Sequence, residues 1–229
     1  MNTLFILAVI PFLFGFTFNP MSQSIELGDK QKSAQFLLEN ETSEKQAIEL
    51  TVKIRTMDEN GKEALVDTKE ISIFPPAVII PPKEKRTIRV NYNGEKDIKT
   101  EKAFRVIAEQ LSVKVDEQQK RRSGIQMLMR YVAALYVTPE DAKSDISVLS
   151  YESTKDGLKV NLQNSGNKHQ ILADPVVTFV EKDKKKSFKG QDLNGFAGEN
   201  ILANSKRSFI LKNIKDPLKG TEATLKLNE

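Results

Sequence analysis

The chain has 229 residues, of which 39% are hydrophobic and 29% charged, a balance typical of a soluble globular protein with room for two ordinary domains. Its net charge of +4 comes from 35 basic and 31 acidic residues that alternate finely along the chain, so nucleic acid is not an expected partner. There is no cysteine and only one histidine, His169, which removes thiol chemistry, thiolate metal sites and most catalytic triads. We therefore expect no catalytic residue, metal or cofactor, and no enzyme.

Residues 3–18 form an uncharged apolar segment. Such a segment is either the core of a secretory signal peptide or a membrane anchor. Because it is short for a membrane span, contains Pro11 and is followed at once by a strand-like pattern, we interpret residues 1–17 as a signal peptide. The anchor stays open as the alternative, since no Lys or Arg precedes the segment and no A-x-A-like cleavage site follows it.

The next part of the chain alternates apolar and polar side chains, which is typical of β-strands with one buried face. Asn60-Gly61 favours a tight hairpin turn. Proline pairs on either side of residues 77–80 confine that piece to a sheet edge or a crossover, because proline cannot donate to a ladder. The predicted strands in this half are 33–38, 48–54, 64–74, 86–92 and 103–113.

A polar and basic stretch at residues 115–123 predicts a mobile loop. The following residues, 125–137, have strand character over more than twice the usual length of about five or six residues. A helix is the alternative, because Met, Leu and Ala are good helix formers. Gly124 before the segment, Pro139 after it and the lack of a polar face with helical period favour the strand.

Residues 138–143 predict a linker, and a second strand-rich stretch follows it. The lysine cluster at 182–189 is interpreted as the exposed tip between two strands. Short strands at this spacing without long helices predict β-sandwiches, and two of them fit the length. The predicted strands here are 146–151, 158–162, 176–180, 208–211 and 224–227.

Six local patterns occur in order between residues 18 and 212. They are an opening strand at 18–27, a strand at 34–40 that ends in Asn40, a proline-rich crossover and strand at 74–92, a strand at 104–111, the long segment 124–139 and the polar turn 161–169. In this order they resemble the periplasmic pilus-chaperone family of chaperone–usher systems, nearer its divergent archaic branch. The last two patterns carry most of the resemblance.

The resemblance implies an all-β protein of two immunoglobulin-like sandwiches, residues 18–138 and 139–229, joined at an angle in an L shape. It implies a periplasmic chaperone that binds pilus or fimbrial subunits by donor-strand complementation and delivers them to an outer-membrane usher. Neither a cofactor nor stable membrane insertion after removal of the signal is implied. The alternative is a surface-anchored structural or adhesive protein with two such domains.

A strand lent to a subunit would fill the subunit's groove with alternate side chains. Period-two alternation places Ile125, Met127 and Met129 on one face, and we predict these three as the subunit-binding residues. Flexible methionines suit the pockets of several different subunits. The alternative is that the three side chains complete this protein's own core.

The best-known members of the resembled family hold the subunit's C-terminal carboxylate with an Arg of the first strand and a Lys of the donor strand. In this sequence Ala134 stands at the position of that Lys, and residues 21–24 contain no Arg. A buried carboxylate needs a cation, ideally a guanidinium. We therefore predict Arg105 and Arg130 as the anchoring residues, the alternative being that both are ordinary exposed strand residues.

Overall fold

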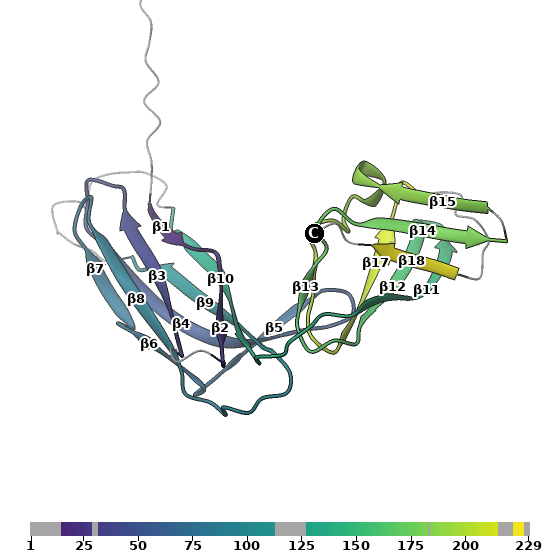
Figure 1. The fold of residues 1–229 in the computed structure, drawn as a ribbon. Coiled ribbons are helices and arrows are strands. Elements are labelled where there is room, and N and C mark those ends of the chain that lie inside the picture. The colour runs from purple at the N-terminus through teal and green to yellow at the C-terminus, as the bar shows by residue number, and fades with distance from the viewer. Residues whose placement is uncertain (1–14, 29–31, 113–126, 183, 215–221, 227–229) are drawn as a thin grey trace, which may run out of the picture.

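The computed structural model describes residues 15–28, 32–112, 127–182, 184–214 and 222–226 (Figure 1). Its elements are almost all β-strands, and they form two sandwiches that meet at an angle (Figure 1). Among these residues no helix has the length and apolar character needed to cross a membrane. The expected all-β fold with two immunoglobulin-like domains is confirmed.

The first sandwich consists of a four-stranded sheet in the order β1-β3-β8-β6 and a second sheet in the order β2-β10-β9-β4-β5, with β7 also paired to β4. All pairs are antiparallel except β2 with β10, which run parallel. The opening strands β1 and β2 belong to different sheets, so the start of the chain contributes to both layers. The bounds are β1 Phe16–Asn19, β2 Ser22–Glu26, β3 Ser33–Asn40, β4 Gln46–Met57, β5 Glu63–Asp67, β6 Ile71–Phe74, β7 Ala77–Ile80, β8 Lys85–Tyr92, β9 Lys102–Gln110 and β10 Arg130–Thr138.

Period-two alternation explains how the first sandwich buries its core. In β8, for example, Ile88, Val90 and Tyr92 point inward, and the residues between them are more exposed. Phe18 of β1 stacks on Phe36 of β3 with ring centroids 5.0 Å apart. One hydrophobic cluster collects such residues from Phe16 to Val137.

The second sandwich consists of the sheets β11-β12-β17 and β15-β14-β18, with the short pair β13-β16 beside them. Its core is a separate cluster that includes Leu158, Phe179, Phe196 and Phe209. The bounds are β11 Ile146–Thr154, β12 Gly157–Asn164, β13 Gln170–Ile171, β14 Val176–Glu181, β15 Lys184–Lys189, the 3-10 turn η2 Gly190–Leu193, β16 Asn200–Ile201, β17 Ser205–Leu211 and β18 Glu222–Lys226.

Several local predictions can be compared with these strands. Asn60-Gly61 does form the β4–β5 hairpin turn, with Gly61 at a φ of +85° that favours glycine. Residues 77–80 form the edge strand β7, as the flanking prolines require. The interpretation of 182–189 as a strand tip is wrong for most of its length, because Lys184–Lys189 forms the edge strand β15 with Phe188 buried. Exposed lysines along such an edge discourage pairing with another chain.

The end of the apolar N-terminal segment is part of the first sandwich. Phe16 and Thr17, both inside the predicted signal peptide 1–17, lie in β1 and pair with Asn40 and Glu39 of β3. Phe16 is 2% exposed, its ring contacts Tyr131 edge-on at 5.0 Å, and its carbonyl oxygen accepts a hydrogen bond from the Tyr131 hydroxyl at 2.7 Å. A leader that ended after residue 17 would remove these contacts from the folded domain.

Phe16→Ala is expected to lower the free energy of unfolding by about 3–5 kcal/mol, because it opens a cavity in the core. The measurement is denaturant unfolding of the protein purified after export, with Thr17→Ala, half-buried beside it, as the control. If Phe16→Ala leaves stability unchanged, Phe16 is not part of the exported domain.

Candidate partner-binding strand

Strand β10 is paired along both edges only in its second half. Arg130–Val137 pairs with Glu109–Lys102 of β9 on one side, and Ala134–Thr138 pairs with Ser22–Glu26 of β2 on the other. Within the described part of the chain, no strand pairs with the second edge of residues 130–133. An unpaired edge offers backbone N–H and C=O groups to another strand, so this end of β10 can accept one from a partner.

The side chains of β10 divide between two faces. Tyr131, Ala133, Leu135 and Val137 point into the core of the first sandwich. The alternate residues, from Arg130 to Thr138, lie on the outer face of the sheet. Both faces become buried toward the end of β10, where Ala134, Tyr136 and Thr138 are almost inaccessible. The strand is therefore enclosed at its end and open at its beginning.

Two of the three predicted subunit-binding residues, Met127 and Met129, lie at this open beginning. Met129 is partly buried, packs against the core of the first sandwich and approaches Gly15, where a Cβ atom would lie 3.0 Å from the Met129 Cγ. Its carbonyl oxygen accepts a hydrogen bond from the Gln110 backbone at 2.9 Å, which extends the β9 pairing by one residue. Met127 is 71% exposed. Ile125 lies outside the described residues.

Exposed apolar side chains gather around Met127. Leu128, the next residue, is 51% exposed, and Leu111, just beyond the end of β9, is 41% exposed. Exposed groups of large apolar residues mark interaction sites more often than isolated ones do. The open end of β10 thus combines unpaired backbone groups with an apolar surface.

Arg105 lies in the enclosed half of the sheet. It is the cross-strand neighbour of Ala134. Its Nε donates to Glu63 Oε2 at 3.0 Å and its Nη2 donates to Glu63 Oε1, so Glu63 of β5 is bound in the bidentate manner. Arg105 therefore carries a carboxylate partner already.

Sequence reasoning missed a second guanidinium beside Arg105. Arg55 of β4 is 4% exposed, forms an ion pair with Glu63 at 2.6 Å and donates to the Tyr136 hydroxyl at 3.3 Å. Alternation along β4 could have found it, because Ile48, Leu50, Val52 and Ile54 face the core and place Arg55 on the outer face with Lys53. Two guanidinium groups thus converge on one carboxylate.

The structure does not bring Arg130 to the same place. Arg130 lies four residues before Ala134 on β10, about 13 Å along the strand from the row of Arg105. It forms its own ion pair with Glu109 at 3.3 Å, with both side chains 53% exposed. The two predicted anchoring residues therefore belong to two separate ion pairs, one half-buried and one exposed.

The ionisation of Glu63 reflects its two neighbours. Burial alone would raise the pKa of its carboxyl group, but the hydrogen bond from Arg105 and the charges of Arg55 and Arg105 outweigh burial and hold the pKa below its usual value. Glu63 is therefore an anion at neutral pH. The two positively charged guanidinium groups stabilise the ionised form of Glu63 over its protonated form.

The enclosed end of β10 is also fixed to the second sandwich. The Tyr136 ring stacks on His169 with centroids 3.7 Å apart, and the Tyr136 hydroxyl accepts a hydrogen bond from Asn200 at 2.7 Å. Glu101, which is 8% exposed, accepts hydrogen bonds from the Thr138 hydroxyl at 3.0 Å and from the His169 backbone at 2.9 Å. These contacts join β10 to both domains.

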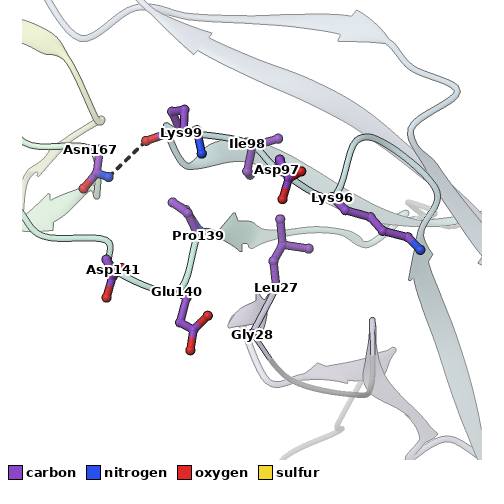
Figure 2. Close-up of a pocket in the computed structure, with 10 residues that line it drawn as sticks. All are labelled: Leu27, Gly28, Lys96, Asp97, Ile98, Lys99, Pro139, Glu140, Asp141 and Asn167. Carbon is purple, nitrogen blue, oxygen red and sulfur yellow. Dashed lines mark hydrogen bonds between the residues drawn. The ribbon is translucent and has the colours of Figure 1, made fainter.

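The polar turn at 161–169 completes this joint. The Asn167 side-chain amide donates a hydrogen bond to the Lys99 carbonyl at 3.0 Å and accepts one from the Lys143 backbone N–H at 2.8 Å. The backbone carbonyl of Asn167 accepts a hydrogen bond from the Glu101 backbone N–H. Figure 2 shows Asn167 hydrogen-bonded to Lys99, and both residues help to line a pocket of about 300 Å³. Acidic and basic side chains both line this pocket, so it does not select a ligand of one charge.

The fold and this strand define a class: a protein of two immunoglobulin-like domains with a strand edge open to a partner and a hydrogen-bonded joint between the domains. Residues 18–143 match the family described as pili and flagellar-assembly chaperone, PapD N-terminal domain. The chain belongs to this family, whose members are non-enzymatic assembly chaperones. The resemblance inferred from the sequence is thereby confirmed.

Solved structures show the same fold. One is the CsuC–CsuE chaperone–tip adhesion subunit pre-assembly complex from the archaic chaperone–usher Csu pili of Acinetobacter baumannii, at 18% identity and a TM-score of 0.65, with 93% of this chain and 97% of that chain covered. The class 5 fimbriae chaperone CfaA has 16% identity, a TM-score of 0.63 and coverage of 94% and 99%. The Salmonella enterica SafA pilin–SafB chaperone complex has 11% identity, a TM-score of 0.61 and coverage of 94% and 97%. No curated protein matches the sequence.

Glu101→Ala is expected to lower the free energy of unfolding by on the order of 3 kcal/mol, because it removes the charged acceptor of hydrogen bonds from Thr138 and His169 in a buried place. Denaturant unfolding measures the change. Glu109→Ala, which removes a half-exposed carboxylate paired with Arg130, is the matched control and should cost at most about 1 kcal/mol. Equal effects of the two substitutions would contradict a structural role for the joint.

Proposed function

We propose that this protein is a periplasmic chaperone that binds and stabilises pilus subunits by donor-strand complementation and delivers them to an outer-membrane usher. The observation that carries the proposal is the open beginning of β10, where residues 130–133 have one unpaired edge and Met127 and Leu128 are exposed beside it. Two similar structures support it, since each is of a chaperone with a pilus protein: a tip adhesion subunit and a pilin.

To be donated to a subunit, a strand must be held in the chaperone at one end and open to the subunit at the other. The enclosed end of β10, held by Tyr136 and Thr138, keeps the strand from moving when its open end is paired with a subunit. The open end then supplies backbone hydrogen bonds to the subunit's sheet, while alternate side chains enter the subunit's groove. A strand fixed in advance loses less conformational freedom on binding, which favours affinity.

In this mechanism Ile125, Met127 and Met129 are the donor side chains. Met129 packs on the core of the chaperone's first sandwich. It therefore marks the boundary between that core and the apolar groove of the bound subunit. Moving away from β10, Met127 comes after Met129, and its side chain is exposed to solvent. Its unbranched side chain adapts to pockets of different shape, as a chaperone for several subunits requires.

Arg105 and Arg130 are proposed as two separate candidates for holding the subunit's C-terminal carboxylate, because they lie in different ion pairs about 13 Å apart along the strand. Arg105 is the better placed of the two, because it lies beside Ala134 in the enclosed half of the sheet and is only 18% exposed. A charge-assisted bond is stronger where water is partly excluded. Arg130, at the open end, is the more exposed of the two.

Export is part of the same proposal. The apolar segment at 3–14 would direct the chain to the periplasm and then be removed. Phe16 is a core residue of the first sandwich, so we place the end of the leader before Phe16 and not after residue 17. The remaining chain then keeps both opening strands.

Met127→Asp is expected to abolish capture of a subunit, because a charge would have to enter an apolar groove. The measurement is co-purification of the chaperone with a pilus subunit co-expressed in the periplasm. Leu149→Asp, at an exposed apolar position of similar size in the second sandwich, is the control and should leave capture intact. Met127→Asp that still yields a one-to-one complex would refute the donor assignment.

Arg105→Ala and Arg130→Ala are each expected to weaken subunit binding, by roughly tenfold or more for Arg105, because a charge-assisted hydrogen bond contributes about 1.5–3 kcal/mol. Titration of the purified chaperone variants against a subunit measures the change. Arg89→Ala, on β8 of the opposite sheet, is the control. Unchanged affinity in both arginine variants would eliminate the proposed anchor.

A further inference from the structure

The carboxylate of Glu63 occupies the donors that an incoming carboxylate would need. We propose that Glu63 is a resident occupant of a carboxylate site formed by Arg105 and Arg55, and that a partner's C-terminal carboxylate binds by replacing it. This inference rests on the proposed function, because the partner is the subunit that β10 pairs with. It adds a residue, Glu63, that opposes binding.

The geometry shows the competition. The Nε and Nη2 atoms of Arg105 form the edge that binds a carboxylate with two parallel hydrogen bonds, and Glu63 holds both. Glu63 Oε1 is shared with the Nη2 atom of Arg55 at 2.6 Å. A second carboxylate cannot take the same edge of Arg105 while Glu63 remains on it.

The site is reachable from outside at Arg105 and Glu63, but not at Arg55. The Arg105 and Glu63 side chains are 18% and 28% exposed, whereas that of Arg55 is 4% exposed. Arg55 is fixed by the Tyr136 hydroxyl, and its buried Nε has no hydrogen-bond partner among the described residues. Arg55 therefore has donor capacity to spare for a carboxylate that enters at Arg105.

Glu63 lies on a hairpin that contacts the second sandwich, so its replacement by another carboxylate can affect both domains. It opens β5 directly after the β4–β5 turn, and Figure 1 shows this hairpin extending from the first sandwich toward the second. The Glu59 carbonyl of the turn accepts a hydrogen bond from the Ser208 backbone at 2.7 Å, and Gly61 lies against Arg207, so that a Cβ atom at residue 61 would clash with the Arg207 Nη2 atom. Displacement of Glu63 thus acts on a hairpin that bridges the two domains.

The lowered pKa of Glu63 agrees with a true competitor, because the group is charged at the pH at which a peptide carboxylate is charged. The opposite role is that Glu63 only orients Arg105 for the partner. The two roles predict changes of opposite sign when the charge of Glu63 is removed. Competition predicts tighter binding, and orientation predicts weaker binding.

The test compares wild type, Glu63→Gln and Asp67→Asn. Asp67 is the matched control, because it lies on the same strand β5, pairs with Lys53 at 2.6 Å and is 91% exposed. The probes are two synthetic peptides with the C-terminal strand sequence of a candidate subunit, one ending in a free carboxylate and the other in an amide. Calorimetric titration gives the Kd of each pair, and thermal unfolding verifies that each variant is folded.

Glu63→Gln is expected to bind the carboxylate peptide about tenfold more tightly than wild type does, a difference of about 1.4 kcal/mol. The amide peptide should bind wild type and Glu63→Gln equally, and Asp67→Asn should behave as wild type. Weaker or unchanged binding of the carboxylate peptide to Glu63→Gln, or no difference between the two peptides in any variant, would overturn the proposal. If Met127→Asp still abolishes subunit capture in that case, the proposed function stands and only the role of Glu63 fails.

Discussion

The attachment of the end of β10 to both domains is the constraint on which the rest of the structure depends. Tyr136 and Thr138 are held through His169, Asn200 and Glu101, so the last residues of the strand cannot shift without disturbing both sandwiches. Among the residues that the structure describes, none attaches the second edge of β10 at its beginning in a comparable way. A strand fixed at one end and open at the other is suited to pairing with a partner while remaining part of its own sheet.

The two faces of β10 have different roles. Tyr131, Leu135 and Val137 face inward and contribute to a core that Phe16 and Phe18 complete from the opening strand. The outer face carries the row in which Arg105 lies beside Ala134, with Arg55 and Glu63 nearby. Apolar contact is therefore available at the open end and a cation with a resident carboxylate at the enclosed end. In the proposed function, the subunit uses both.

The all-β fold and many of its strands could be predicted from alternation and turn residues alone, as for β8 and the Asn60-Gly61 hairpin. The edge strand β15 was missed because it is almost wholly lysine, and its pairing with β14 depends on the buried Phe188. Arg105 could be named from its strand, but its pairing with Glu63 and Arg55 depends on register across three strands. Likewise, the turn at 161–169 was recognised as a pattern, while its role as a domain joint depends on Lys99 and Glu101, more than 60 residues away.

The most direct test of the central claim is amide hydrogen exchange of the chaperone, alone and in complex with a pilus subunit. We predict that residues 127–133 exchange rapidly in the free protein at the amides that point away from β9, and become protected in the complex. Residues 134–137, already paired on both edges, should be protected in both states. Protection that appears instead at another sheet edge, with residues 127–133 unchanged, would contradict the assignment of β10 as the donated strand.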